Sequence, residues 1–264
     1  PFCFIRRCTQ NMHDKLAWPK EIMKTRKRTA LCLLIAVNLL TAVKMFTYLG
    51  NFEILLWIVA ALPFFIFPRS RFPMKKSVRE SIVPFTLLLT GVYLALWWAG
   101  GYIDGFGRSP YSRSAQGLLL NFGITGGTII AQEFARAFTL ESGSRSKGGM
   151  ILYSAATFYM YGFNFAAAEL AFSRLGSVFP YVGGTLLPAM VAAVFLTWVS
   201  RTAGPIPAII YRLLPEMALW LLPALPDTSW QVKMMLGVAM PLFALLLLMQ
   251  KTGQKRDGKH RKAV

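Results

Sequence analysis

Long apolar runs separated by short basic segments constrain this chain more than any other feature. We predict about eight hydrophobic helices, at roughly 29–49, 52–67, 82–102, 118–140, 150–172, 179–200, 206–222 and 232–249. A helix needs about 20 apolar residues to cross the hydrocarbon core of a bilayer. Charged residues make up only 15% of the chain, whereas soluble domains carry about 25%. The pattern predicts an all-α, polytopic membrane protein.

Basic residues mark alternate loops between these runs. Of the 29 Lys and Arg residues, 22 fall before residue 29, within 68–81, 141–149 and 201–205, or after residue 249. The other loops hold only Arg108, Arg113, Arg174 and Lys233. Because short basic loops stay in the cytoplasm, we predict that both termini are inside (N-in/C-in) and that the loop 104–114 is outside.

The same pattern divides the chain into three parts. We expect a basic cytoplasmic tail at 1–28, an eight-helix membrane domain at 29–249, and a basic cytoplasmic tail or linker at 250–264. Segment 1–22 has mixed polarity and no initial Met, so we expect it to be upstream sequence or the edge of a fragment. Met23, followed by a basic run and an apolar helix, has the pattern of a natural start.

Composition excludes several classes of function. The net charge of +18 does not indicate nucleic-acid binding, because the basic residues lie in short clusters and not on one soluble face. The expected partner is the lipid bilayer. His13 and His260 are the only histidines and lie in the two tails, so we predict no metal site and no histidine-dependent triad in the membrane. No cofactor is expected.

Four charged residues within the predicted spans are the candidate site. A charge in a bilayer costs about 3 kcal/mol on insertion scales, so each needs a partner. Glu133 and Arg136 are three residues apart, and Arg212 and Glu216 are four apart; both spacings place opposite charges on one helical face. We predict that all four form one ion-pair cluster. It would serve as a structural clamp, and the alternatives are a Glu133 that activates water or relays a proton, and a lipid-headgroup contact.

Two further features carry weaker signals. The outer loop 105–112 is rich in turn residues, and its Arg108 and Tyr111 are candidates for a contact with an adjacent domain or a peptide; the alternative is a plain turn. Gly-Gly pairs occur at 100–101, 126–127 and 183–184. Since no strand precedes them, they indicate close helix packing and not phosphate loops.

Four short segments carry a family resemblance together, in this order: 105–112 (GFGRSPYS), 132–136 (QEFAR), 211–216 (YRLLPE) and 222–227 (LPALPD). They resemble the N-terminal multi-helix membrane region of large signal peptidase I-like proteins of Clostridia-type Firmicutes, over roughly 29–249. The resemblance implies a multi-pass protein of the bacterial cell membrane. It also implies, as partners, a C-terminal extracytoplasmic serine peptidase domain or secreted preproteins.

That peptidase domain carries a nucleophilic Ser followed by Met, and a Lys or His general base. The present sequence contains no Ser-Met pair, so no catalytic residue is carried over, and the expected role is support of signal-peptide processing without an active site of its own. One alternative is an intramembrane protease of the CAAX-protease-like family that uses Glu133. Against it, Gln132 replaces the adjacent Glu and the spans contain no histidine. A small transporter or lipid-binding membrane protein is the other alternative.

Overall fold

The computed structural model describes residues 20–46, 52–67, 76–142 and 170–260. This part of the chain is almost entirely helical. The elements, in chain order, are α2 (Lys20–Phe46), α3 (Phe52–Ile66), α4 (Lys76–Asp104), β1 (Phe106–Arg108), α5 (Ala115–Asn121), the π-helix η1 (Phe122–Gly126), α6 (Gly127–Ser142), α9 (Leu175–Tyr181), the π-helix η3 (Val182–Leu186), α10 (Leu187–Ala203), α11 (Pro205–Leu221), β2 (Ala224–Pro226) and α12 (Trp230–His260).

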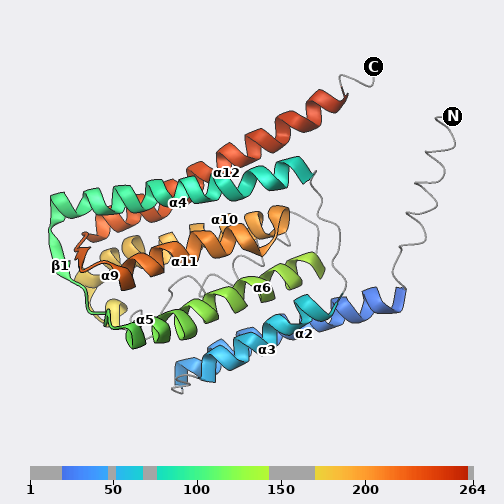
Figure 1. The fold of residues 1–264 in the computed structure, drawn as a ribbon, viewed down its shortest axis with the longest axis horizontal. Helices are drawn as coiled ribbons and strands as arrows, with labels where there is room; N and C mark the ends of the chain where they lie inside the picture. Colours follow the sequence, from blue (N-terminus) through green and yellow to red (C-terminus); the bar gives the residue numbers. More distant parts are fainter. Residues whose placement is uncertain (1–19, 47–51, 68–75, 143–169, 261–264) are drawn as a thin grey trace.

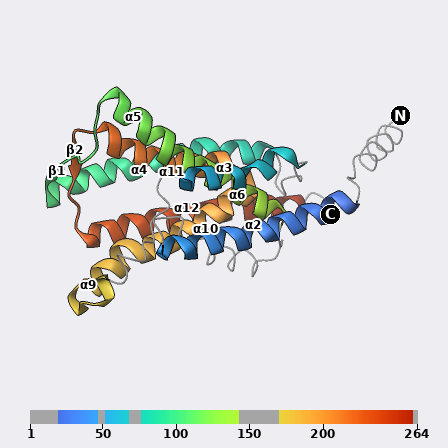
Figure 2. The same cartoon turned by 90° about the horizontal axis from the view of Figure 1, so that it is seen from below.

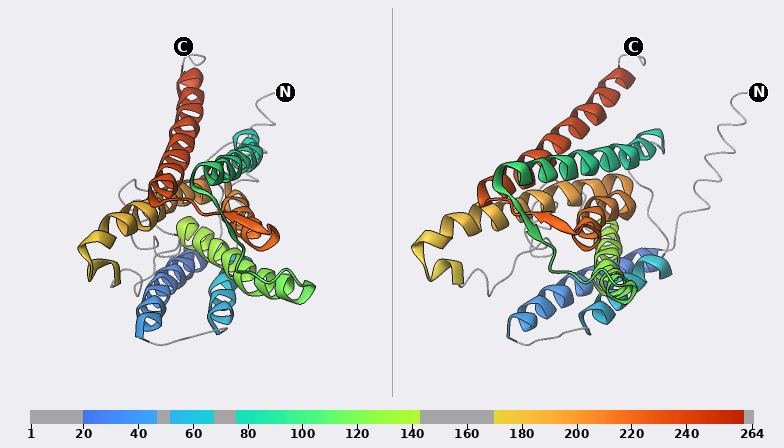
Figure 3. Two further views of the ribbon diagram at one scale, coloured as in Figure 1. Left: turned by 90° about the vertical axis from the view of Figure 1, so that its left-hand side faces the viewer. Right: turned by 60° about the vertical axis from the view of Figure 1, so that its left-hand side comes forward.

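The helices form a bundle of rods that lie side by side along one common axis (Figure 1). We call the end at which β1 and β2 pair the sheet end; α4 ends and α12 begins there, whereas α2 and α4 begin at the opposite end. Figure 1 and Figure 3 show α4, α10, α11 and α12 on one side of the bundle and α2, α3 and α6 on the other, and Figure 2 views the bundle from the side of α2 and α3. The site described below lies where these two sides meet.

Each side has its own apolar core. The larger core joins α4, α10, α11 and α12 through Ile82, Leu89, Phe195, Leu196, Val199, Ala208, Ala244 and Leu248. On the other side, α6 packs against α3 and α2 through small residues such as Ala131 and Ala135 and through the aromatic pair Phe64 and Phe134, whose ring centroids lie 5.0 Å apart. Small side chains let these helices approach closely.

Three described helices are long and apolar enough to cross a membrane, namely Glu80–Asp104, Gly176–Ala203 and Trp230–Gln250. The helix Ile54–Ile66 is apolar but shorter. Large apolar side chains on these helices point outward; Leu88 is 67% exposed and Met235 is 62% exposed. Because exposed apolar area of this extent is unfavourable in water, it indicates that the chain associates with a lipid bilayer.

The observed helices differ from the predicted spans mainly at their ends. We expected the first helix to begin at residue 29, but α2 begins at Lys20, because Lys, Arg, Glu and Met are good helix formers and no Gly or Pro interrupts 20–46. Likewise, α12 continues through the predicted basic tail to His260. The predicted span 150–172 lies outside the described residues except for its last three. The prediction of an all-α chain also missed the two-stranded sheet.

Two rods share one construction. In each, a seven-residue α-helix passes through a five-residue π-helix into a long α-helix, as α5–η1–α6 and as α9–η3–α10. Each contains the sequence Gly-Gly-Thr, at 126–128 and 183–185. A Cβ added to Gly127 would lie 2.9 Å from the Ile54 side chain, and one added to Gly183 would lie 2.8 Å from the Trp230 ring. These glycines therefore allow close helix packing, as predicted.

Candidate functional site

Glu133 is the centre of a polar cluster inside the bundle. It lies on α6, and its side chain is completely buried, as is that of Arg136 one turn later. Arg136 Nε lies 3.1 Å from Glu133 Oε2. The spacing of three residues places both side chains on one face of α6, so the helix itself supplies the first ion pair.

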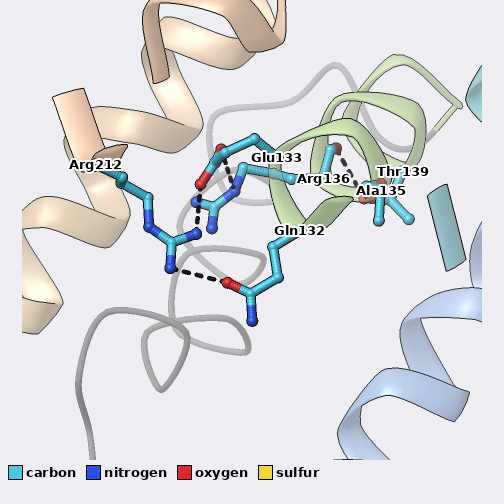
Figure 4. A network of polar contacts seen from close by, with 6 residues as sticks. All are labelled: Gln132, Glu133, Ala135, Arg136, Thr139 and Arg212. Atoms are coloured by element: carbon cyan, nitrogen blue, oxygen red, sulfur yellow. Dashed lines mark hydrogen bonds and ion pairs between the residues drawn. The ribbon is translucent and has the colours of Figure 1, made fainter. Parts of the chain in front are cut away.

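Arg212 completes the cluster from a neighbouring helix. Its Nη1 group donates to Glu133 Oε1 at 2.8 Å, and its Nη2 group donates to Gln132 Oε1 at 2.8 Å (Figure 4). A guanidinium group holds its donors in a rigid fork, and here the fork spans two adjacent residues of α6. The two oxygens of Glu133 thus face different helices, Oε1 toward α11 and Oε2 toward Arg136 of its own helix.

Glu216 was predicted to belong to this cluster, but the structure does not bring it in. It lies one turn after Arg212 on α11 and is half-buried. Among the described residues, no ion pair within 4.0 Å involves its carboxylate. Two features explain this. An Arg that precedes its Glu by four residues has the less favourable orientation of the two. Arg212 is also engaged across the bundle, where it donates to Glu133 and Gln132.

Gln132 is the residue that sequence reasoning missed. It stands beside Glu133 in the sequence, but we considered it only as a departure from a protease motif. The sequence did contain a signal for Gln132, which is its position next to Glu133. A guanidinium group on a facing helix can donate two hydrogen bonds, one to each of two neighbouring side chains. The amide is 7% exposed, so its bond to Arg212 forms within the bundle.

The cluster has limited chemical options. A general base needs a carboxylate oxygen that can reach a proton donor of the substrate; Glu133 Oε1 accepts a hydrogen bond from Arg212, and Oε2 lies 3.1 Å from Arg136 Nε without a hydrogen bond. The hydroxyl of Thr139, one turn after Arg136, donates to the backbone carbonyls of Ala135 and Arg136 within α6 (Figure 4). No group of three His, Cys, Asp or Glu side chains that could hold a metal occurs in the described ranges. The geometry favours a clamp between α6 and α11.

A second buried ion pair lies at the C-terminal end of α6. Arg26 Nη2 donates to Glu141 Oε2 at 2.7 Å, and the two side chains are 2% and 5% exposed. The Arg26 guanidinium lies 5.6 Å from the centroid of the Phe138 ring. Arg26 belongs to the predicted cytoplasmic tail at 1–28, and the structure shows its side chain buried, because α2 is helical here and packs against α6.

The predicted outer loop forms a compact structure at the sheet end. β1 and β2 pair antiparallel, with Arg108 opposite Ala224. The Phe106 ring packs against Trp98 and Tyr102, with centroids 5.0 and 5.3 Å apart. The side chains of Arg108 and Tyr111 are exposed. The segment is therefore not a plain turn, although both candidate contact residues remain free to meet a partner.

Hydrogen bonds fix this sheet to the helices. Asp104 Oδ2, at the end of α4, accepts bonds from the backbone N–H and the hydroxyl of Ser229 at 2.8 and 2.9 Å. Ser229 is the residue before α12, so the carboxylate caps the start of that helix. Ser109 Oγ donates to the carbonyl of Leu219 in α11 at 3.3 Å. Three helices are thus joined at this end.

Comparisons of the chain with protein-family models, with curated proteins and with solved structures found no match.

Proposed function

We propose that this chain is the membrane-embedded region of a signal peptidase I-like protein and that it acts as a scaffold without an active site of its own. The observation that carries the scaffold role is the pairing of Glu133 with guanidinium groups on two helices. Both of its oxygens face guanidinium groups from two helices, which suits a fixed joint between α6 and α11 better than a reactive carboxylate.

The contacts between the four motif segments support treating them as one unit. Segment 132–136 meets segment 211–216 through the Glu133–Arg212 pair. Segment 105–112 meets segment 222–227 through the pairing of β1 with β2. Each segment alone is a weak signal, but segments that resemble one family and also touch in pairs favour a shared role.

We further propose eight membrane spans with both termini in the cytoplasm. The described rods lie roughly along one common axis, which is compatible with this topology (Figure 1). In it, the exposed side chains of Arg108 and Tyr111 are extracytoplasmic. We expect Ser109→Cys to react with a membrane-impermeant thiol reagent on intact cells, and Ser77→Cys to stay protected. The reverse pattern would invert the orientation.

Two experiments test the scaffold role. The purified chain in detergent should not cleave a signal-peptide substrate above the blank. Cleavage that disappears in Glu133→Gln would instead support the intramembrane protease, for which the complete burial of Glu133 is the favourable observation.

A photo-crosslinking residue in place of Tyr111 should give adducts with a secreted preprotein or a signal peptidase domain. The same residue in place of Glu21, in the first turn of α2, is the control and should give none.

A further inference from the structure

The register of β1 against β2 fixes which backbone groups of β1 face its partner. Just before β1, the carbonyl of Gly105 accepts a hydrogen bond from the N–H group of Asp227 at 3.0 Å. Just after it, the N–H group of Ser109 donates to the carbonyl of Pro223 at 3.1 Å. Hydrogen-bonded positions alternate with non-hydrogen-bonded ones along an antiparallel strand. The odd-numbered positions from 105 to 109 therefore face β2.

Phe106 and Arg108 occupy the alternate positions, so their N–H and C=O groups point away from β2. Both residues are exposed. In the part of the chain that the structure describes, no hydrogen bond outside the sheet engages their backbone groups. A row of free backbone donors and acceptors is a template for the pairing of a further strand.

The outer edge of β2 does not offer the same template. By the same alternation, Ala224 and Pro226 point away from β1, but Pro226 has no N–H group to donate. Pro226 is also buried, and α4 packs against β2. Open strand edges do not occur in the hydrocarbon of a bilayer, so β1 is expected to lie beyond the lipid tails. Its edge is therefore the side of this sheet that a partner can reach.

The side chains of Phe106 and Arg108 share one face of β1, because side chains alternate between the two faces of a strand. The Phe106 ring packs against Trp98 and Tyr102, with centroids 5.0 and 5.3 Å apart, yet Phe106 is 40% exposed and Tyr102 is 79% exposed. In the described ranges, Arg108 forms no ion pair within 4.0 Å. Side chains that lie directly opposite each other on paired strands interact. An added strand would thus place one side chain beside an aromatic surface and another beside a cation.

We propose that the open edge of β1 binds an extended peptide segment of another protein by antiparallel strand addition, with an acidic residue opposite Arg108 and an apolar residue two positions later opposite Phe106. In this binding mode, main-chain hydrogen bonds supply affinity and the alternate side chains supply specificity. β1 has three residues, so a short segment is sufficient. A second copy of this chain fits less well, because β1 contains no carboxylate to meet Arg108. The proposal deepens the contact proposed above for Arg108 and Tyr111, and rests on it for the identity of the protein that supplies the segment.

A synthetic peptide tests the charge preference of this edge. The probe is dye-labelled Thr-Glu-Thr-Val-Thr with blocked ends, whose Thr and Val residues favour the extended state. Its binding to the full chain in detergent is measured by fluorescence anisotropy. Replacing Glu by Lys turns an attractive cross-strand pair into a repulsive one, and should weaken binding about tenfold. Equal binding of the two peptides, or no binding of the Glu peptide, would overturn the proposal.

Backbone methylation of the same peptide tests strand addition itself. In the proposed register, the N–H groups of Glu and Val donate to β1, whereas that of the central Thr points away. N-methylation of Glu and Val should therefore abolish binding, and N-methylation of the central Thr should preserve it. Hydrogen exchange at the amides of Phe106 and Arg108 should slow when the unmethylated peptide binds. Equal tolerance of both methylations, or unchanged exchange at these two amides, would contradict strand addition.

A charge reversal in the protein completes the test. Arg108→Glu should reverse the preference, so that the Lys peptide binds more tightly than the Glu peptide. Arg174→Glu makes the same change of net charge at an exposed position before α9 and should keep the wild-type preference. A preference unchanged in Arg108→Glu would contradict the proposed pairing. Absence of preprotein adducts from the Tyr111 crosslinker, with peptide binding intact, would overturn the proposed function and leave strand addition standing.

Discussion

Glu133 and Glu141 lie about two turns apart on α6, yet the bundle holds them differently. Glu133 meets Arg136 from its own helix and Arg212 from α11, and Arg212 also bonds Gln132. Glu141, at the end of the helix, pairs with Arg26, whose guanidinium lies near the Phe138 ring. The cost of an uncompensated charge increases with depth. The pair at Glu133 joins α6 to α11, and the pair at Glu141 joins α6 to α2.

The largest loss of stability is expected on removal of the central carboxylate. Glu133→Gln leaves two guanidinium groups facing a neutral amide inside the bundle. Breaking a buried pair costs about 3–5 kcal/mol, so the variant should unfold well below the wild type in detergent. Glu21→Gln, at an exposed position, should unfold with the wild type. A melting temperature of Glu133→Gln within the error of the wild type would show that the cluster does not hold α6 and α11 together.

A smaller loss is expected at the end of α6. Arg26→Met keeps the apolar stem but removes the partner of Glu141, which lies near the end of the bundle and can regain water more easily. We expect a loss of about 2–3 kcal/mol, read from thermal unfolding. Arg113→Met removes an exposed cation at the sheet end and serves as the matched control. If the two variants behaved alike, the buried pair would contribute nothing, and the difference between the two ends of α6 would disappear.

The smallest loss is expected at the sheet end. Asp104→Ala removes the acceptor for the backbone N–H and hydroxyl of Ser229. Loss of a helix cap costs about 1 kcal/mol. Hydrogen exchange should then speed up in the first turn of α12 and leave α6 unchanged. Equal protection in Asp104→Ala and wild type would mean that the cap does not fix α12 to α4.

Sequence reasoning predicted the apolar helices and the two local charge spacings, because both follow from helical periodicity. It brought Glu133, Arg136 and Arg212 into one hypothesis, and the structure places these three in contact. It did not separate Glu216 from them. Spacing alone does not show that the Arg212 guanidinium already donates to residues of α6 and is therefore unavailable to Glu216 on its own helix. The role of the cluster stays a prediction.

Other features depend on contacts between distant residues and were out of reach. Arg26 and Glu141 are 115 positions apart, and a basic run at the start of a helix ordinarily indicates a solvated tail. β1 and β2 are three residues each, too short for an alternating pattern to appear. The two Gly-Gly-Thr sequences were visible, but their shared construction emerges only from the π-helices that accompany them.

The central claim is that Arg212 and Glu133 act as one unit between α11 and α6, and a double-mutant cycle tests it most directly. Arg212→Met, Glu133→Gln and the double variant are compared by thermal unfolding in one detergent. Because each single change removes one member of the pair and leaves the other charge in the bundle, the loss in the double variant should fall short of the sum of the single losses by more than about 1 kcal/mol. Losses that add within about 0.5 kcal/mol would contradict the account.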